Sequence, residues 1–123
     1  MGYSDWDVPI KARSNRSNDL KEFKYNDSQL VITLIEEDTD AVWHVFFTEI
    51  QAFRSTSEEC SNATMLQVPT NGGFFKSSDS DWLMELGKGK IQFLNNSLHF
   101  IICCYDEMIE VIADERTINI LMD

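Results

Sequence analysis

The sequence lacks any apolar run approaching the roughly 20 residues that a membrane-spanning helix requires. Its N-terminal stretch, MGYSDWDVPI, also lacks the basic start, apolar centre and small-residue cleavage site of a secretory signal. These two absences predict a soluble, cytoplasmic protein that makes no use of a membrane.

Cysteine is scarce, and the three that occur do not suggest a chemical centre. Their number is odd, and the neighbours Cys103 and Cys104 could bridge only through a strained ring, so we expect no disulfide framework. Adjacent strand residues point to opposite faces, so this pair cannot jointly hold one metal ion without distortion. No CxxC or HxxxH pattern accompanies Cys60 or the pair. We therefore predict no metal site and no cofactor.

Catalytic signatures are missing as well. The only histidines, His44 and His99, fall on predicted strands, and no Gly-rich elbow surrounds any cysteine. The carboxylates of Asp106 and Glu107 would raise the pKa of a nearby thiol rather than lower it. We predict that the protein is not an enzyme. A small hydrolase that pairs a cysteine with a histidine in space stays an alternative.

Basic residues are few, since 10 Lys and Arg face 21 Asp and Glu, for a net charge of −11. The two signs balance over residues 1–27, so the whole acidic excess comes from residues 28–123. Such a surface repels phosphate backbones, which disfavours nucleic acid and favours a basic protein partner. The alternative is an acidic face that only keeps the protein soluble.

The residues that are present predict one domain over 1–123, of the α+β class and mostly antiparallel β. Short β-branched and aromatic segments alternate with turn signals, which predicts about six to eight strands. The main strand segments are 20–25, 30–35, 42–54, 91–93, 98–105, 108–113 and 117–121. We expect turns at 26–28 and 106–107, and an acidic hairpin tip at 36–40. Consecutive phenylalanines break the alternation in the long strand, so we expect a bulge or slip near Thr48.

One short helix is predicted near residues 78–86. Ser78 would be its N-cap with Asp81 three residues on, and Gly87 would end it. The polar segment 55–72 reads as a long loop. Residues 101–113 also fit helical spacing, although Ile and Val favour strands there. A single curved sheet around the helix and a two-sheet sandwich with the helix at one end both fit this order of elements.

A family resemblance is concentrated in the segment HFIICCYDEMIEVIADE. Its pattern Tyr-Asp-x-x-x-Glu-Val-x-Ala, formed by Tyr105, Asp106, Glu110, Val111 and Ala113, resembles small immunity proteins of bacterial toxin systems. These include the immunity proteins of contact-dependent growth inhibition and related polymorphic toxins. Trp82-Leu83 in SDSDWLMEL and Phe53-Arg54 share in the resemblance. It implies a non-enzymatic, cytoplasmic inhibitor that binds one cognate toxin domain, often a nuclease with a basic cleft.

The acidic turns are the predicted contacts for such a partner. The first group comprises Glu36, Glu37, Asp38 and Asp40 at the hairpin tip, with Trp43 as an aromatic anchor, and the second comprises Asp106, Glu107 and Glu110. A merely solvated turn and ordinary core packing of Trp43 are the alternatives. A structural or adaptor module that self-associates through strand edges is the competing function, although the sequence gives no sign of a homo-oligomer.

Overall fold

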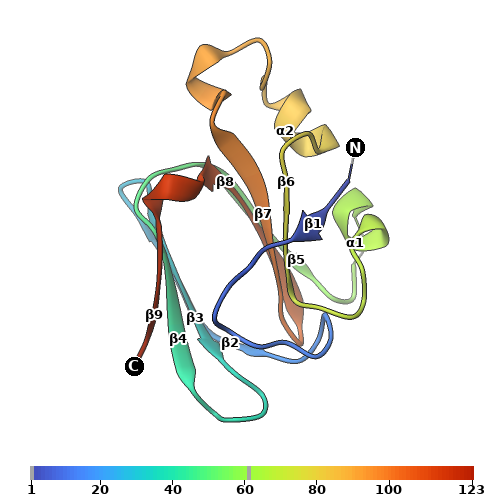
Figure 1. Ribbon diagram of the computed structural model, residues 1–123, viewed down its shortest axis with the longest axis vertical. Helices are drawn as coiled ribbons and strands as arrows, with labels where there is room; N and C mark the ends of the chain where they lie inside the picture. Colours follow the sequence, from blue (N-terminus) through green and yellow to red (C-terminus); the bar gives the residue numbers. More distant parts are fainter. Residues whose placement is uncertain (1, 61) are drawn as a thin grey trace.

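The protein is described by a computed structural model that covers residues 2–60 and 62–123. Met1 and Ser61, the latter inside the predicted 55–72 loop, lie outside the described residues. Two antiparallel sheets pack face to face, and two short helices cover the outer side of one of them (Figure 1). The structure therefore has the two-sheet arrangement rather than a single curved sheet.

The five-stranded sheet has the order β1-β6-β7-β8-β5. Its strands are β1 (Ser4–Asp5), β5 (Ile50–Ser57), β6 (Phe74–Ser77), β7 (Ser97–Cys103) and β8 (Glu107–Asp114). The four-stranded sheet has the order β2-β3-β4-β9. It contains β2 (Asp19–Asn26), β3 (Gln29–Ile35), β4 (Val42–Phe47) and β9 (Ile118–Met122). The predicted class, α+β and mostly antiparallel β, is confirmed. The described residues form nine strands where about six to eight were predicted, and two short α-helices where one was predicted.

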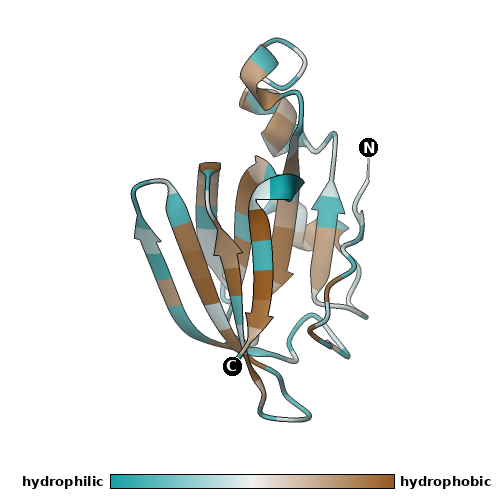
Figure 2. Ribbon diagram, turned by 60° about the vertical axis from the view of Figure 1, so that its left-hand side comes forward, coloured by the Kyte–Doolittle hydropathy of each residue, from teal (hydrophilic) through white to brown (hydrophobic). Residues whose placement is uncertain are grey.

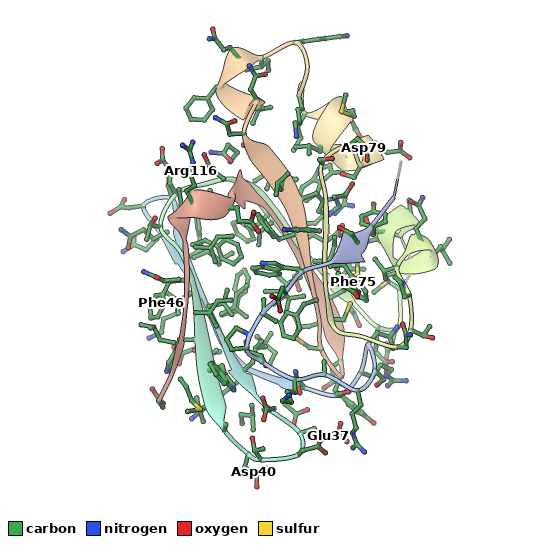
Figure 3. The ribbon with its side chains drawn as sticks, in the orientation of Figure 1. Glu37, Asp40, Phe46, Phe75, Asp79 and Arg116 are labelled. Atoms are coloured by element: carbon green, nitrogen blue, oxygen red, sulfur yellow. The ribbon has the colours of Figure 1, made fainter. Side chains whose placement is uncertain are left out.

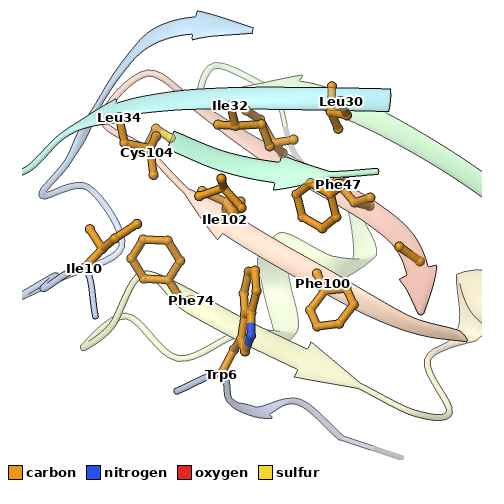
Figure 4. Close-up of a cluster of buried hydrophobic side chains, with 14 residues drawn as sticks. Trp6, Ile10, Leu30, Ile32, Leu34, Phe47, Phe74, Phe100, Ile102 and Cys104 are labelled. Carbon is orange, nitrogen blue, oxygen red and sulfur yellow. The ribbon is translucent and has the colours of Figure 1, made fainter. Parts of the chain in front are cut away.

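Period-two alternation on β7 divides the interior into two layers. Phe100 and Ile102 point toward the four-stranded sheet and pack with Leu30, Ile32 and Phe47 in the main core (Figure 4). The intervening residues point the other way, toward α1 (Ala63–Gln67) and α2 (Asp81–Glu85), where a second cluster forms. Hydrophobic residues accordingly gather in the strands, while the connections are mostly polar (Figure 2). The five-stranded sheet is buried on both faces because helices cover its outer side.

The segment predicted as one strand over 42–54 is in fact two strands, in different sheets. β4 ends at Phe47 and β5 begins at Ile50, so the irregularity expected near Thr48 is a crossing between the sheets. At the crossing, the N–H of Thr48 donates to the carbonyl of Thr117 and that of Ile50 to the carbonyl of Ser28. The consecutive apolar residues Phe46 and Phe47 thus lie just before the point where the chain leaves one sheet and enters the other.

Three other local predictions need correction. Residues 92–94 form a 3-10 turn, η1 (Gln92–Leu94), rather than a strand, because Leu94 is the buried residue there while Phe93 is exposed. The predicted 55–72 loop contains the end of β5 and helix α1. Helix α2 begins after Ser80, not Ser78, since the Ser80 hydroxyl accepts from the N–H of Leu83.

The turn predicted at 26–28 is found, and so are strands at 98–105 and 108–113, although β7 ends at Cys103. Strands β1 and β6 were not predicted. Asp27 and Ser28 both have positive φ, 50° and 65°, as the tight turn joining β2 and β3 requires. β7 pairs antiparallel with β8, with Ile102 opposite Ile109, so the helical alternative for residues 101–113 is wrong. The remaining short element, η2 (Glu115–Thr117), leads into β9.

Candidate partner-binding surface

The β3–β4 hairpin tip carries the first predicted group of carboxylates. Glu37, Asp38 and Asp40 are exposed there. Arg13, from the segment before β2, reaches Glu37 at 2.9 Å and Asp38 at 3.2 Å. Two of these three carboxylates are therefore paired with Arg13. Because all of these side chains are exposed to water, the ion pairs contribute little to stability.

Glu36, in contrast, is buried, and it does not lie on the surface as expected for a contact residue. Its carboxylate accepts a hydrogen bond from the N–H of Lys11 at 3.0 Å and another from the hydroxyl of Thr39. These two hydrogen bonds lower the pKa of Glu36 below its usual range. Glu36 is a structural acceptor that joins the hairpin, through the Thr39 hydroxyl, to the segment before β2, through the Lys11 N–H.

Trp43 is half-buried and packs against the main core. Its buried indole N–H meets no acceptor at hydrogen-bonding geometry among the described residues, although Trp43 helps to lower the pKa of Glu36. Packing against the core was the alternative to the predicted anchor, and the structure favours that alternative for most of this side chain.

The β7–β8 turn carries the second predicted group. Asp106 is exposed, and Glu107 is half-buried with its carboxylate accepting from the Ser55 hydroxyl at 2.7 Å. The pairing of β5 with β8 sets Ser57 opposite Glu107, which brings the next residues, Glu58 and Glu59, to the same place. Sequence reasoning missed these two because it placed them in a long loop; the antiparallel register is the signal that would have found them.

A buried asparagine joins the two acidic groups. Asn18 accepts from the N–H of Glu37 through its side-chain oxygen at 3.2 Å, and from the N–H of Tyr105 through its carbonyl at 2.8 Å. Its amide nitrogen also donates to the carbonyl of Lys11 at 3.0 Å. The segment around Asn18 thus ties the β3–β4 tip to the β7–β8 turn.

The two predicted groups therefore meet at one end of the molecule, the end that carries Glu37 and Asp40 in Figure 3. We call it the acidic end and define it by Asp19, Glu37, Asp38, Asp40, Glu58, Glu59, Asp106 and Glu107. These carboxylates come from four separate segments of the chain. Only the fold could bring them together.

Glu110 does not belong to this surface, because it is fully buried between the five-stranded sheet and the helices. Arg54 donates to both of its oxygens, at 2.7 and 3.0 Å, and His99 lies 2.8 Å from one of them. Asn62 donates to the other oxygen at 3.2 Å. Burial alone would raise the pKa of Glu110, but the hydrogen bonds from His99 and Arg54 outweigh it and hold the pKa at about 2.

The buried cluster contains a hydroxyl, an imidazole and a carboxylate in line. Ser80 Oγ lies 2.7 Å from His99 Nδ1, while His99 Nε2 faces Glu110. A proton on Nε2 donated to the carboxylate leaves Nδ1 to accept from the serine hydroxyl. This order resembles a hydrolase triad, yet all three side chains are completely buried, and the serine oxygen already caps helix α2. The arrangement fixes α2 to the sheet and offers a substrate no approach.

The other groups named by the enzyme alternative are His44, in the four-stranded sheet, and the two buried cysteines at the end of β7. His44 lies between Thr33, at 3.0 Å, and Asp123, at 2.7 Å, in the four-stranded sheet. Burial raises the pKa of the Cys103 thiol to about 12 and raises that of Cys104 as well, so neither thiol ionises near neutral pH. The structure gives this alternative no support.

Neither a metal site nor a membrane-crossing helix is found in the part of the chain that the structure describes. Within residues 2–60 and 62–123, no three His, Cys, Asp or Glu side chains are arranged to hold an ion. Over those residues no helix is long and apolar enough to span a bilayer. Comparison with protein families, with curated proteins and with solved structures finds no match for this chain.

Proposed function

We propose that this protein is a cytoplasmic, non-enzymatic immunity protein that binds a cognate bacterial toxin domain through its acidic end and thereby neutralises it. The observation that supports this most is the gathering of exposed carboxylates from four segments at one end. Oriented charge of one sign favours a partner surface of the opposite sign and speeds the encounter with it. The partner is accordingly a basic protein surface, as in the cleft of a nuclease.

Two features of the acidic end suit a rigid binding surface. Glu37, Asp38 and Asp40 stand on the β3–β4 turn and Asp106 on the β7–β8 turn. The buried Asn18 fixes these two turns relative to each other. A surface that is already in its bound shape loses little conformational entropy on binding. The hydrogen bonds and burial of Ser80, His99 and Glu110 also agree with a non-enzymatic role, because they leave that cluster structural.

Growth protection tests the proposal directly. An immunity gene stands beside its toxin gene, so the C-terminal domain of the secreted protein encoded next to this one is the toxin to use. Expression of that domain alone should stop growth, and co-expression of this protein should restore it. If the toxin domain kills equally well in the presence of the folded protein, the proposal is wrong.

The adaptor alternative draws on a different feature, the edge strand β9. Leu121 and Met122 on this strand are 55% and 58% exposed, and β9 pairs with only β4 within its sheet. An exposed apolar edge strand is a template for pairing with a second copy. A solution mass of two chains, with no protection against the neighbouring toxin, would favour this alternative.

A further inference from the structure

A cavity of about 250 Å³ opens beside the β7–β8 turn at the acidic end. Its apolar lining comes from Met65, Val68, Cys103 and Met108, which belong to the cluster between the five-stranded sheet and α1. This volume is below the roughly 300–1,000 Å³ of pockets that take drug-sized ligands. The cavity therefore has room for one long side chain rather than for a cofactor.

The rim of the cavity is charged. Glu58 and Glu107 line it, together with Arg16 and the exposed thiol of Cys60. An apolar lining below two carboxylates matches a side chain with an apolar stem and a cationic head.

The chain's own Arg16 shows which cation the rim accepts. Its guanidinium lies 2.8 Å from the Glu58 carboxylate and 4.8 Å above the centre of the Tyr105 ring. Its Nε also donates to the Tyr105 carbonyl at 3.3 Å. Stacking on an aromatic face together with planar hydrogen bonding is characteristic of arginine rather than lysine. The side chain of Arg16 stays half exposed, so it lies at the mouth without filling the cavity.

We propose that the cavity binds an arginine side chain of the protein partner, and that Arg16 occupies the guanidinium position at the rim until the partner arrives. The partner's stem contacts Met65, Val68 and Met108, and its guanidinium takes Glu58 and the Tyr105 ring in place of Arg16. This inference rests on the proposed function, since it names one contact of the same acidic end.

The test uses the peptide Gly-Arg-Gly as the probe and the protein alone, followed by NMR of the methionine methyl groups. Titration should shift the signals of Met65 and Met108 and leave those of Met84 and Met122, which lie outside the cavity, in place. Gly-Glu-Gly serves as the probe of opposite charge and should shift none of them. Unmoved Met65 and Met108 signals in the presence of Gly-Arg-Gly would overturn the inference.

Two pairs of matched variants separate local contact from general attraction. Arg16→Gln frees Glu58 and should tighten Gly-Arg-Gly binding about three- to fivefold, the worth of a released exposed ion pair. Arg13→Gln removes the same charge from the same segment. Because the native Arg13 pairs with Glu37 and Asp38 rather than with Glu58, this substitution should tighten Gly-Arg-Gly binding less. Glu58→Gln should weaken binding, whereas Glu59→Gln, outside the cavity lining, should not.

Equal tightening of Gly-Arg-Gly binding by Arg16→Gln and Arg13→Gln would contradict the proposal that Arg16 occupies the guanidinium position. It would show that both substitutions act only through long-range charge. Alkylation of Cys60 gives a readout that does not depend on any of these substitutions. The alkylating reagent should modify the exposed Cys60 thiol before the buried thiols of Cys103 and Cys104. The modified Cys60 should then block binding of Gly-Arg-Gly. Failure of these tests leaves growth protection unaffected, so the two proposals can fail separately.

Discussion

Glu110 illustrates what a single buried carboxylate requires. An ionised group with no partners could not be buried at this position, because desolvation of an unpaired charge is too costly. Here Arg54, His99 and Asn62 together satisfy both oxygens. The three residues come from β5, β7 and the N-cap of α1, so the carboxylate joins the sheet to α1 directly, and to α2 through His99 and Ser80.

Glu110→Gln should therefore lower the free energy of unfolding by about 3 kcal/mol, at the low end for a broken buried pair because Arg54 is partly exposed. Urea unfolding monitored by tryptophan fluorescence measures this loss. Glu107→Gln on the same strand, where the side chain is only half-buried, is the matched control and should change it by less than about 1 kcal/mol. Equal losses in the two variants would contradict the assigned role.

The same residue predicts how stability depends on pH. The folded pKa of Glu110, about 2, lies below the ordinary value of 4.5, so the carboxylate stabilises the fold above about pH 5. That contribution is lost progressively as pH falls from 5 toward 2. In the Glu110→Gln variant, the free energy of unfolding should therefore fall less between pH 5 and pH 2 than in the native protein.

At these positions the sequence could not separate a surface carboxylate from a buried one. Glu36 and Glu110 were assigned to the surface because most acidic residues are solvated. Alternation alone placed Glu110 on the same face as Met108 and Ile112, a face that is solvated in an isolated sheet. Only the packing of α1 and α2 over that face buries it.

Among the elements, helix α2 depends most on one side chain. The helix has only five residues, so it persists through its cap and its contacts rather than through its own propensity. Ser80 accepts from the N–H of Leu83 and also faces His99 at 2.7 Å, so the same hydroxyl caps the helix and attaches it to β7.

Ser80→Ala should destabilise the protein by about 1–2 kcal/mol, the usual cost of a lost N-cap. Ser78, the cap expected from the sequence, is exposed, and Ser78→Ala is the matched control with an expected change within about 0.5 kcal/mol. Thermal unfolding of both variants decides between the two positions. A larger loss for Ser78→Ala would show that the helix begins earlier.

Element types were more predictable than element partners. The strands at β2, β3, β7 and β8 follow from alternation and turn residues that act locally. The split of residues 42–54 into β4 and β5 does not, because whether a chain stays in one sheet or crosses to another depends on contacts distant in sequence. Likewise, the apolar pair Ile91 and Phe93 resembled a strand, although both side chains are exposed and only Leu94 is buried.

At the scale of the whole molecule, the N-terminal segment packs against the acidic end. Arg13 pairs with the hairpin tip and Arg16 with Glu58, while the backbone N–H of Lys11 donates to the buried Glu36 beside the tip. The sequence showed that charge balances over residues 1–27 and that acid dominates after them. It could not show that the balanced segment lies between two acidic turns, since that depends on the buried hydrogen bonds of Asn18.

The central claim is that binding depends on the acidic end and not merely on net charge. The measurement that tests it most directly is calorimetric titration of the neighbouring toxin domain into two triple variants, each lacking three negative charges. One is Asp38→Asn, Asp40→Asn and Asp106→Asn; the other is Asp27→Asn, Glu49→Gln and Glu85→Gln, all exposed and outside the acidic end. The first should bind at least about tenfold more weakly than the native protein, and the second within about twofold of it. Equal weakening by both variants, or none by the first, would contradict the account.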